Sequence, residues 1–355
     1  MYTRQLPTQI DTGDRTLARN NPGTIYVIHE ADFLTGEKTN LAKIGLVKDP
    51  RTPEDRLKEH QTGNSKKLSI AGTFRAQDVS AAEALCHRRL STKRINGEWF
   101  EPETGSDPDT FHDQIELSIR DTSSLLKLSQ ETKDLSTTKS NGKTRNATDA
   151  ELELTAELAD YENSIRIYKS EQALIKVAFA NDTQSAFGIE GVCEWTFSEG
   201  KPEFSMTQLQ LVDATLYASL IEPKVSGTFS PKTPRGKTPA RLPFPSNLGK
   251  LIEVGRVLER SRSVEEKHLR YLEIEEIVAQ LETVREEIRL QLMISMAEYD
   301  EIKDVATWRR VLKDRAVAGA KKTVESVSPE KFLKAHKASS DSRGLAIVPY
   351  RAYPH

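Results

Sequence analysis

Residues 23–100 alternate between extended and helical patterns, and this alternation constrains the fold more than any other feature of the chain. The runs GTIYVIHE (23–30) and NLAKIGLV (40–47) are rich in β-branched and aromatic residues, and the turn-rich segment between them predicts an antiparallel hairpin. A helix is predicted to follow Thr52, a suitable N-cap in front of Pro53 and two acidic residues, and to stop at Gly63.

The second half of this segment repeats the alternation. Residues 67–75 (KLSIAGTFR) predict a third strand, and residues 80–90 predict a short amphipathic helix. The apolar side of that helix is expected to carry Ala81, Ala84, Leu85 and Cys86. Glu98-Trp99-Phe100 supplies a last extended piece, so the sequence predicts an α+β domain with a small antiparallel sheet flanked by helices.

The rest of the chain is predicted to be mostly α-helical and to be divided by polar segments. Long helices are expected at residues 150–180 and 248–300, where apolar residues recur near helical spacing. The resulting division is a flexible arm (1–21), the α+β domain with a trailing helix (22–131), a polar linker (132–149), a helical module (150–229), a linker rich in proline and basic residues (230–246) and a second helical module (247–355).

The two helical modules resemble copies of one unit. A shift of 113 residues places Ile165, Ile175 and Phe179 on Val278, Ile288 and Leu292. The same shift places Ile189, Val192 and Trp195 on Ile302, Val305 and Trp308. Matched helix faces, followed by the same I-x-x-V-x-x-W pattern, indicate a duplication.

Charge and composition restrict the partners that the chain can have. The formal net charge is −2, but residues 43–97 carry twelve Lys or Arg against six Asp or Glu, and this local surplus suits a nucleic-acid surface. Two cysteines, Cys86 and Cys193, cannot build a disulfide scaffold, and a reducing compartment is expected. Because no run of 18 apolar residues occurs, we expect a cytoplasmic protein without a membrane contact.

Three separated features of the α+β domain could form one site. Tyr26 lies on the first predicted strand and Lys43 on its hairpin partner, whereas Arg56 and His60 are four residues apart on one helix and share a face. Glu83 and His87 have the same spacing on the next helix. Taken singly, these are ordinary strand and helix side chains, and Cys86 beside His87 lacks the second Cys/His pair of a zinc site.

The segments GTIYVI, KIG, RLKEHQTGN, AEALCH and GEWF, taken in this order, resemble the GIY-YIG nuclease superfamily in the pattern of its phage and bacterial branch. The resemblance covers about residues 22–101, and Lys43 stands where the family has its second tyrosine. It implies a GIY-YIG domain that hydrolyses DNA phosphodiester bonds in a phage, a mobile element or a bacterial defence locus.

The resemblance also implies a role for each residue of the site. Glu83 corresponds to the glutamate that holds one divalent metal ion, Mg²⁺ or Mn²⁺, and Arg56 to the arginine beside the scissile phosphate. Tyr26 corresponds to the tyrosine that contacts or deprotonates the attacking water, and His60 to an assisting helix residue. Both remain candidates for the general base, because nearby cations would lower the phenol pKa from about 10 and imidazole titrates near about 6.5. Lys43 completes the catalytic set, whereas His87 is interpreted as structural.

Further contacts with DNA are expected from basic and amide side chains around this site. They are Lys48, Asn64, Lys66, Lys67, Arg88, Arg89, Lys93 and Arg94. The alternative to catalysis is a nucleic-acid-binding or docking protein that uses the same fold without cutting.

Residues 270–352 show a weaker resemblance to the C-terminal helical region of YqaJ-like phage exonucleases. The residues that carry it are Ala306-Thr307-Trp308, Val317, Ser328-Pro329-Glu330 and Arg343. It implies a DNA-handling module without a second catalytic centre, since no acidic cluster leads to an E-x-K pattern. The alternative is dimerisation, and a homodimer is expected because long amphipathic helices bury their apolar stripes against partners.

Overall fold

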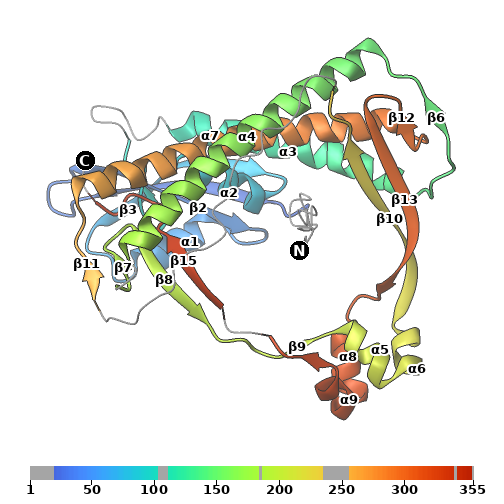
Figure 1. The fold of residues 1–355 in the computed structure, drawn as a ribbon. Helices are drawn as coiled ribbons and strands as arrows, with labels where there is room; N and C mark the ends of the chain where they lie inside the picture. The colour runs from blue at the N-terminus through green and yellow to red at the C-terminus, as the bar shows by residue number, and fades with distance from the viewer. Residues whose placement is uncertain (1–19, 103–110, 184–185, 235–255, 340–341, 354–355) are drawn as a thin grey trace. The chain divides into compact units, whose positions relative to one another are not determined.

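The computed structural model describes residues 20–102, 111–183, 186–234, 256–339 and 342–353 (Figure 1). The expected arm at residues 1–21 and the expected linker at residues 230–246 therefore lie mostly outside the described residues.

The chain forms two compact units. The first comprises Met1–Leu90 and Glu98–Glu131, and the second comprises Ser91–Gly97 and Thr132–His355. The predicted α+β fold class is confirmed, since an antiparallel sheet with flanking helices is followed by mostly helical regions. Among the helices of the described residues, none has both the length and the apolar character that a membrane span requires.

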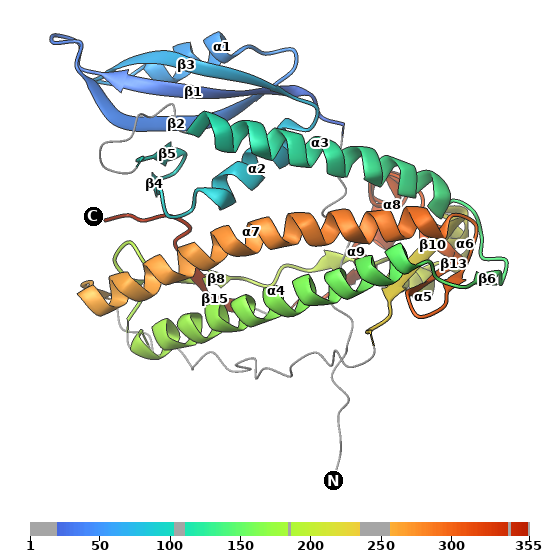
Figure 2. The ribbon, with the colours of Figure 1, turned by 90° about the horizontal axis from the view of Figure 1, so that it is seen from above.

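The first unit is built on an antiparallel sheet with the strand order β3-β1-β2-β5 (Figure 2). Its strands are β1 (Gly23–Ala31), β2 (Lys38–Lys48), β3 (Lys67–Ala76) and β5 (Trp99–Phe100), and its helices are α1 (Pro53–Gln61), α2 (Val79–Arg89) and α3 (Phe111–Ser136). Strand β4 (Arg94–Asn96) and the end of α3 from Thr132 onward fall in the second unit. The predicted hairpin and third strand are confirmed.

Helix α1 begins where the sequence predicted. The Thr52 side chain accepts a hydrogen bond from the Asp55 N–H, while the Asp55 carboxylate accepts one from the Thr52 N–H. This reciprocal capping box satisfies two backbone donors at the start of the helix, where Pro53 has none to satisfy. The cap fixes the first turn of α1 and thereby the direction of the site residues that follow it.

Helix α2 buries a different side from the predicted one. Its buried residues are Val79, Ala82, Cys86 and Arg89. Ala84 is exposed, and Ala81 and Leu85 are only partly buried, so of the expected set only Cys86 is buried. The helix begins one residue earlier than expected, and the larger Val79 side chain sets the buried stripe at spacings of three and four.

The second unit contains two copies of one arrangement. The first copy consists of β6 (Thr144–Arg145), α4 (Asp149–Asp182), β7 (Gly188–Ile189), β8 (Cys193–Ser198), β9 (Glu203–Phe204), α5 (Met206–Val212), α6 (Ala214–Ser219) and β10 (Ile221–Pro231). The second copy consists of β11 (Val257–Leu258), α7 (Arg262–Met296), β12 (Glu301–Ile302), β13 (Ala306–Ala316), α8 (Ala320–Val327), α9 (Pro329–Lys334), β14 (His336–Lys337) and β15 (Ser342–Ile347). The two expected helical modules therefore also contain strands.

The predicted shift of 113 residues relates the two copies. It converts the bounds of β6 and β7 into those of β11 and β12, and the first residues of α4 and β8 into those of α7 and β13. It also relates the two helix caps, because the side chains of Thr148 and Ser261 each accept a hydrogen bond from the backbone N–H three residues later. The duplication is confirmed, although the second long helix begins at Arg262 rather than at residue 248.

Each copy completes its sheets with strands of the other copy. Strand β8 pairs with β15 and strand β13 with β10, and both pairings are antiparallel. Strand β7 pairs with β11 and strand β12 with β6, and both pairings are parallel. The exchange is reciprocal, so an internal pseudo-twofold axis relates the two copies.

The long helices α4 and α7 lie side by side (Figure 2). Lys169 pairs with Glu282 at 2.6 Å, and Glu171, further along α4, pairs at 2.8 Å with Arg270, which lies earlier on α7. The helices are therefore antiparallel. Apolar residues of these helices had suggested a homodimer, but here the two helices pack against each other within one chain. The homodimer stays an untested prediction.

Each end of this helix pair has its own core, and the two cores are counterparts. One contains Ile288, Leu292, Ile302, Val305, Ala306 and Trp308. The other contains Ile175, Phe179, Ile189, Val192, Cys193 and Trp195, each 113 residues earlier. Phe229 of β10 packs against the first core and Leu345 of β15 belongs to the second, so each core includes a residue from the other copy.

The segment 132–149, which was expected to be a linker, is part of the second unit. It holds the end of α3, strand β6 and the capped start of α4. The Ser140 N–H donates to the Arg310 carbonyl at 2.9 Å, and the Arg310 N–H donates to the Ser140 hydroxyl at 2.8 Å. Polar residues of this segment form hydrogen bonds with backbone groups of β13. Composition alone cannot distinguish such residues from the solvent-exposed polar residues of a linker.

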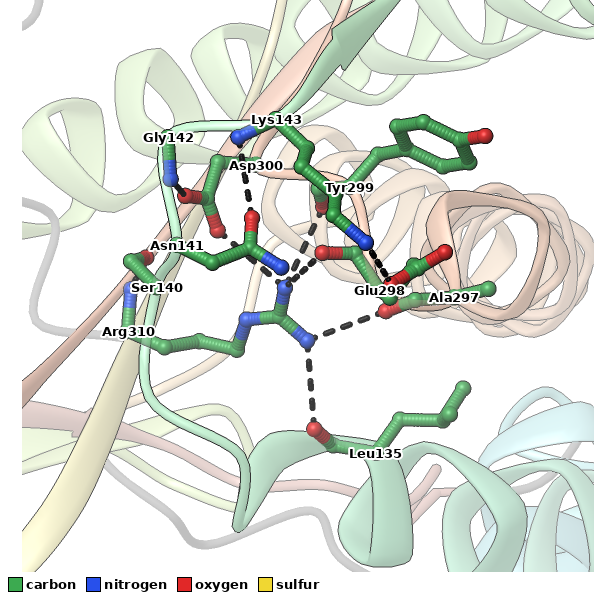
Figure 3. A network of polar contacts seen from close by, with 10 residues as sticks. All are labelled: Leu135, Ser140, Asn141, Gly142, Lys143, Ala297, Glu298, Tyr299, Asp300 and Arg310. Atoms are coloured by element: carbon green, nitrogen blue, oxygen red, sulfur yellow. Dashed lines mark hydrogen bonds and ion pairs between the residues drawn. The ribbon is translucent and has the colours of Figure 1, made fainter.

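Arg310 lies at the centre of this region with 1% of its side chain exposed (Figure 3). Its guanidinium group donates to the carbonyl oxygens of Leu135, Ala297, Glu298 and Tyr299 at 3.0 to 3.3 Å. It also pairs with the Asp300 carboxylate at 3.1 Å. The cation therefore ties the end of α3 and the carbonyl end of α7 to strand β13, where a positive charge is electrostatically favoured.

We expect Arg310→Met to lower the free energy of unfolding of the second unit by about 3–5 kcal/mol, because it leaves Asp300 and several carbonyls buried without their donor. The matched control is Arg309→Met at the exposed neighbouring position, which should cost less than about 0.5 kcal/mol. Urea unfolding followed by tryptophan fluorescence measures both. Equal midpoints for the two variants would contradict the role of Arg310.

Candidate active site

Tyr26 lies in the middle of β1, and its side chain is fully buried. It is paired with Gly45 on β2, and a Cβ atom at Gly45 would lie 2.6 Å from the Tyr26 hydroxyl oxygen. Glycine in the KIG segment therefore leaves the space that the tyrosine ring occupies. The hydroxyl oxygen lies 3.1 Å from Nε2 of His60, which the sequence placed in the same site.

Helix α1 brings Arg56 and His60 to the same tyrosine. The guanidinium group of Arg56 forms a hydrogen bond with Tyr26, and its Nη1 donates to Glu59 at 2.6 Å. Glu59 also pairs with Arg51, so one carboxylate forms ion pairs with both Arg51 and Arg56. Tyr26, Arg56 and His60 therefore meet as expected from their i, i+4 spacing on α1.

Lys43 extends the site across β2. Its Nζ lies 2.7 Å from the Glu98 carboxylate and 5.9 Å from the centroid of the Trp99 ring, and 12% of its side chain is exposed. Glu98 was not among the expected site residues. The signal was present in the GEWF segment, where this glutamate precedes the tryptophan that pairs with Lys43 on β5.

Burial and charge set the protonation of the pair formed by Tyr26 and His60. Burial raises the pKa of Tyr26 above 10, and the hydrogen bond and charge of Arg56 oppose this shift without outweighing it. Burial, followed by the charges of Lys43 and Arg56, lowers the pKa of His60 below 6.5. At neutral pH the pair therefore consists of a phenol and a neutral imidazole, which can accept a proton.

Glu83 lies on α2, partly buried, and its charge acts on Tyr26. In the part of the chain that the structure describes, no group of three or more His, Cys, Asp or Glu side chains could hold a metal ion. A divalent ion at Glu83 would therefore take fewer than three such side chains from the protein. Such a donor set fits Mg²⁺, which keeps several waters and binds through one or two carboxylates together with phosphate oxygens.

His87, four residues after Glu83, has a structural position. Its Nε2 lies 3.0 Å from the carbonyl oxygen of Ile44, and its ring lies 5.0 Å from that of Phe100. These contacts join α2 to β2 and β5, and so they hold the helix that carries Glu83 against the strand that carries Lys43.

The residues expected to contact DNA have diverse surroundings. Lys48 and Lys67 are exposed, Asn64 and Arg88 are partly buried, and Lys66 lies 3.7 Å from Asp32. Lys93 and Arg94 fall in the second unit, where Arg94 lies 6.0 Å from the Tyr350 ring.

Arg89 requires a correction. It is buried, and its guanidinium group pairs with Asp121 at 2.6 Å and donates to the Ser118 hydroxyl at 3.4 Å. These contacts fix α2 to α3, so the side chain is structural and cannot reach a phosphate.

We expect His60 to titrate below 6.5 in the folded chain and Lys43→Met to raise its pKa, because the substitution removes a cation and frees the Glu98 carboxylate. The control is Lys48→Met, which removes an exposed lysine from the end of the same strand. Histidine resonances followed by NMR across a pH titration measure the shift. A pKa that Lys43→Met lowers, or leaves where it is, would contradict this arrangement.

Comparison with known proteins gives one match. Residues 23–120 match the family model described as the T5orf172 domain. A search of curated proteins and a search of solved structures each found no match.

Proposed function

We propose that the first unit is the catalytic domain of a metal-dependent endonuclease that hydrolyses DNA phosphodiester bonds. The observation that carries this proposal is the meeting of Tyr26, Arg56 and His60 at one point, with Lys43 and Glu83 close enough to act on it electrostatically. The match to the T5orf172 domain supports it, because it covers the same segment as the GIY-YIG pattern. Buried, free Cys86 and Cys193 suit the cytoplasmic location that we propose with it.

Hydrolysis requires a water placed opposite the leaving oxygen and stabilisation of the charge that builds up on the phosphoryl oxygens. Neutral His60 can accept a proton through its contact with the Tyr26 hydroxyl, which makes the imidazole the favoured base and the phenol its relay to water. Arg56 offers a permanently charged planar fork to the non-bridging oxygens. A Mg²⁺ or Mn²⁺ ion held by Glu83 would supply further neutralisation of the phosphate charge.

Lys43 replaces the tyrosine of the related pattern, and its surroundings suggest its role. Its ion pair with Glu98 fixes the ammonium group near His60, whose pKa it lowers. We therefore assign Lys43 to electrostatic tuning of the base rather than to proton transfer.

A non-catalytic DNA-binding domain is the second candidate. The observation that favours it is that the described residues contain no group of three or more His, Cys, Asp or Glu side chains that could hold a metal ion. Binding would then use the same arginine and lysine side chains without a chemical step.

A plasmid-nicking assay separates these two functions. We expect cleavage in millimolar Mg²⁺ or Mn²⁺, none in excess EDTA, and a loss of at least about a hundredfold in rate for Glu83→Ala, since one weakly held ion depends on this ligand. The control is Glu54→Ala, which removes an exposed carboxylate from the first turn of α1. Binding of DNA by a wild-type chain that never cuts it would favour the second candidate.

Arg56→Lys tests the contact with the phosphate. The substitution keeps the charge but loses the bidentate fork, so turnover should fall sharply while the Kd for DNA changes little. Arg51→Lys is a matched control, because Arg51 shares the Glu59 carboxylate but has no proposed contact with the scissile phosphate. Equal turnover in the two variants would show that Arg56 does not act on the reacting group.

A further inference from the structure

Strands β10 and β13 form a long antiparallel ribbon in the second unit (Figure 1). Eleven residues of each strand are paired without a register shift, from Ile221 opposite Ala316 to Pro231 opposite Ala306. Strand β12 pairs with the ribbon only at Ala306 and Thr307 of β13, so in the described residues the remainder of the ribbon is two-stranded.

One face of this ribbon is basic. Side chains alternate between the two faces of a strand, so Arg309, Lys313 and Arg315 share a face, and all three are exposed. Lys224 lies opposite Lys313 and adds to this face. The one acidic residue paired with the basic positions, Glu222, forms an ion pair with Lys224 at 2.5 Å.

The three β13 cations carry charge that no carboxylate of the described residues neutralises. Arg315 donates to the Ser226 hydroxyl at 3.1 Å, but none of the three forms an ion pair within the described residues. Arg310, on the opposite face, is instead buried and paired with Asp300. Because successive side chains of β13 point to opposite faces, the buried Arg310 and the exposed Arg309 and Arg315 lie on different faces of the ribbon.

The duplication provides an internal comparison. Residues 306–337 of the second copy contain nine Lys or Arg against three Asp or Glu, whereas the equivalent residues 193–224 of the first copy contain two against five. Apart from the short strands β9 and β14, the two copies keep the same order of elements, but these segments carry opposite net charge. Apart from the buried Arg310, packing does not require this difference, because Arg309, Lys313 and Arg315 are exposed, and an anionic partner on the second copy accounts for it.

The dimensions of the ribbon suit duplex DNA. Eleven residues of strand extend about 36 Å, close to the 34–36 Å of one helical turn. A major groove about 12 Å wide admits a two-stranded antiparallel ribbon. We propose that the β10–β13 ribbon is a second DNA-binding element, which lies along a groove and contacts phosphates through Arg309, Lys313 and Arg315.

This inference rests on the proposed function for the nature of its ligand, but its test does not require cleavage. Binding of a fluorescent 30-base-pair duplex to the full chain is measured by anisotropy in EDTA over a series of salt concentrations. The test variant is Arg309→Gln/Lys313→Gln/Arg315→Gln. The matched control replaces three exposed lysines of the same unit that lie off the ribbon, Lys201, Lys267 and Lys303, by Gln.

The ribbon variant should bind DNA at least tenfold more weakly than the control in 0.1 M salt. Its plot of log K against log salt concentration should be shallower by about 2 to 3, since each lost phosphate contact contributes about 0.9. The same affinity and slope in both variants would overturn the proposal and would leave an acidic protein as the partner of this face. Weaker binding by the ribbon variant of a chain that proves unable to cut DNA would support the ribbon and reject the nuclease.

Folding of the ribbon variant is checked by circular dichroism and thermal unfolding. If the triple substitution unfolds the chain, Arg309→Gln and Lys313→Gln are measured singly, and each should make the salt slope shallower by about 0.9. Unchanged slopes in both single variants would also overturn the proposal.

Discussion

The guanidinium group of Arg310 is a buried cation, and the second unit is arranged around the need to satisfy it. Burying such a charge is costly unless it is paired and its hydrogen-bond donors are used, and here a carboxylate and four carbonyl oxygens accept from its two terminal nitrogens. The equivalent residue of the first copy is Phe197. This difference follows from position, because the end of α3 and the segment 132–149 enter at the Arg310 end of the helix pair. Arg310 thus lies where the end of α3 and the segment 132–149 contact the duplicated part of the second unit.

The exchanged strands make the two copies inseparable. Because β10 completes the sheet of β13, and β15 completes that of β8, neither copy contains all of its own core. Such an exchange is the arrangement that domain swapping produces between two identical chains, here contained in one. We infer that the second unit unfolds as a whole. Because the two copies are fused in one chain, their exposed positions can diverge while the shared core constrains the buried ones. The contrast between the acidic segment 193–224 and the basic segment 306–337 follows from this.

Local sequence patterns predicted the first unit well, because its determinants are local. Its alternating β-branched runs and the Thr52 cap can be read without knowing the fold, and so can the 113-residue shift that relates the two copies of the second unit. Features that depend on partners distant in sequence could not be predicted. Glu98 belongs to the site because it pairs with Lys43, 55 residues away in the sequence. Arg89 was predicted to be a surface cation, and only the fold shows that it pairs with Asp121. The exchange of strands between copies has no signature in the sequence at all, since each strand would have the same pattern with either partner.

Charge counting overstated the field that the first unit presents to DNA. At least six of the twelve cations between residues 43 and 97 form ion pairs among the described residues, namely Lys43, Arg51, Arg56, Lys66, Arg75 and Arg89. Exposed pairs among them can rearrange when a phosphate arrives, but each exchange replaces one favourable contact by another and gains little. Phosphate affinity comes mainly from cations whose counterions are small and are released on binding. Arg309, Lys313 and Arg315 of the ribbon, which have no ion pair within the described residues, meet that condition better than the paired cations around the site. In the functions that we propose, the site of the first unit positions one phosphate and the ribbon of the second unit holds the duplex.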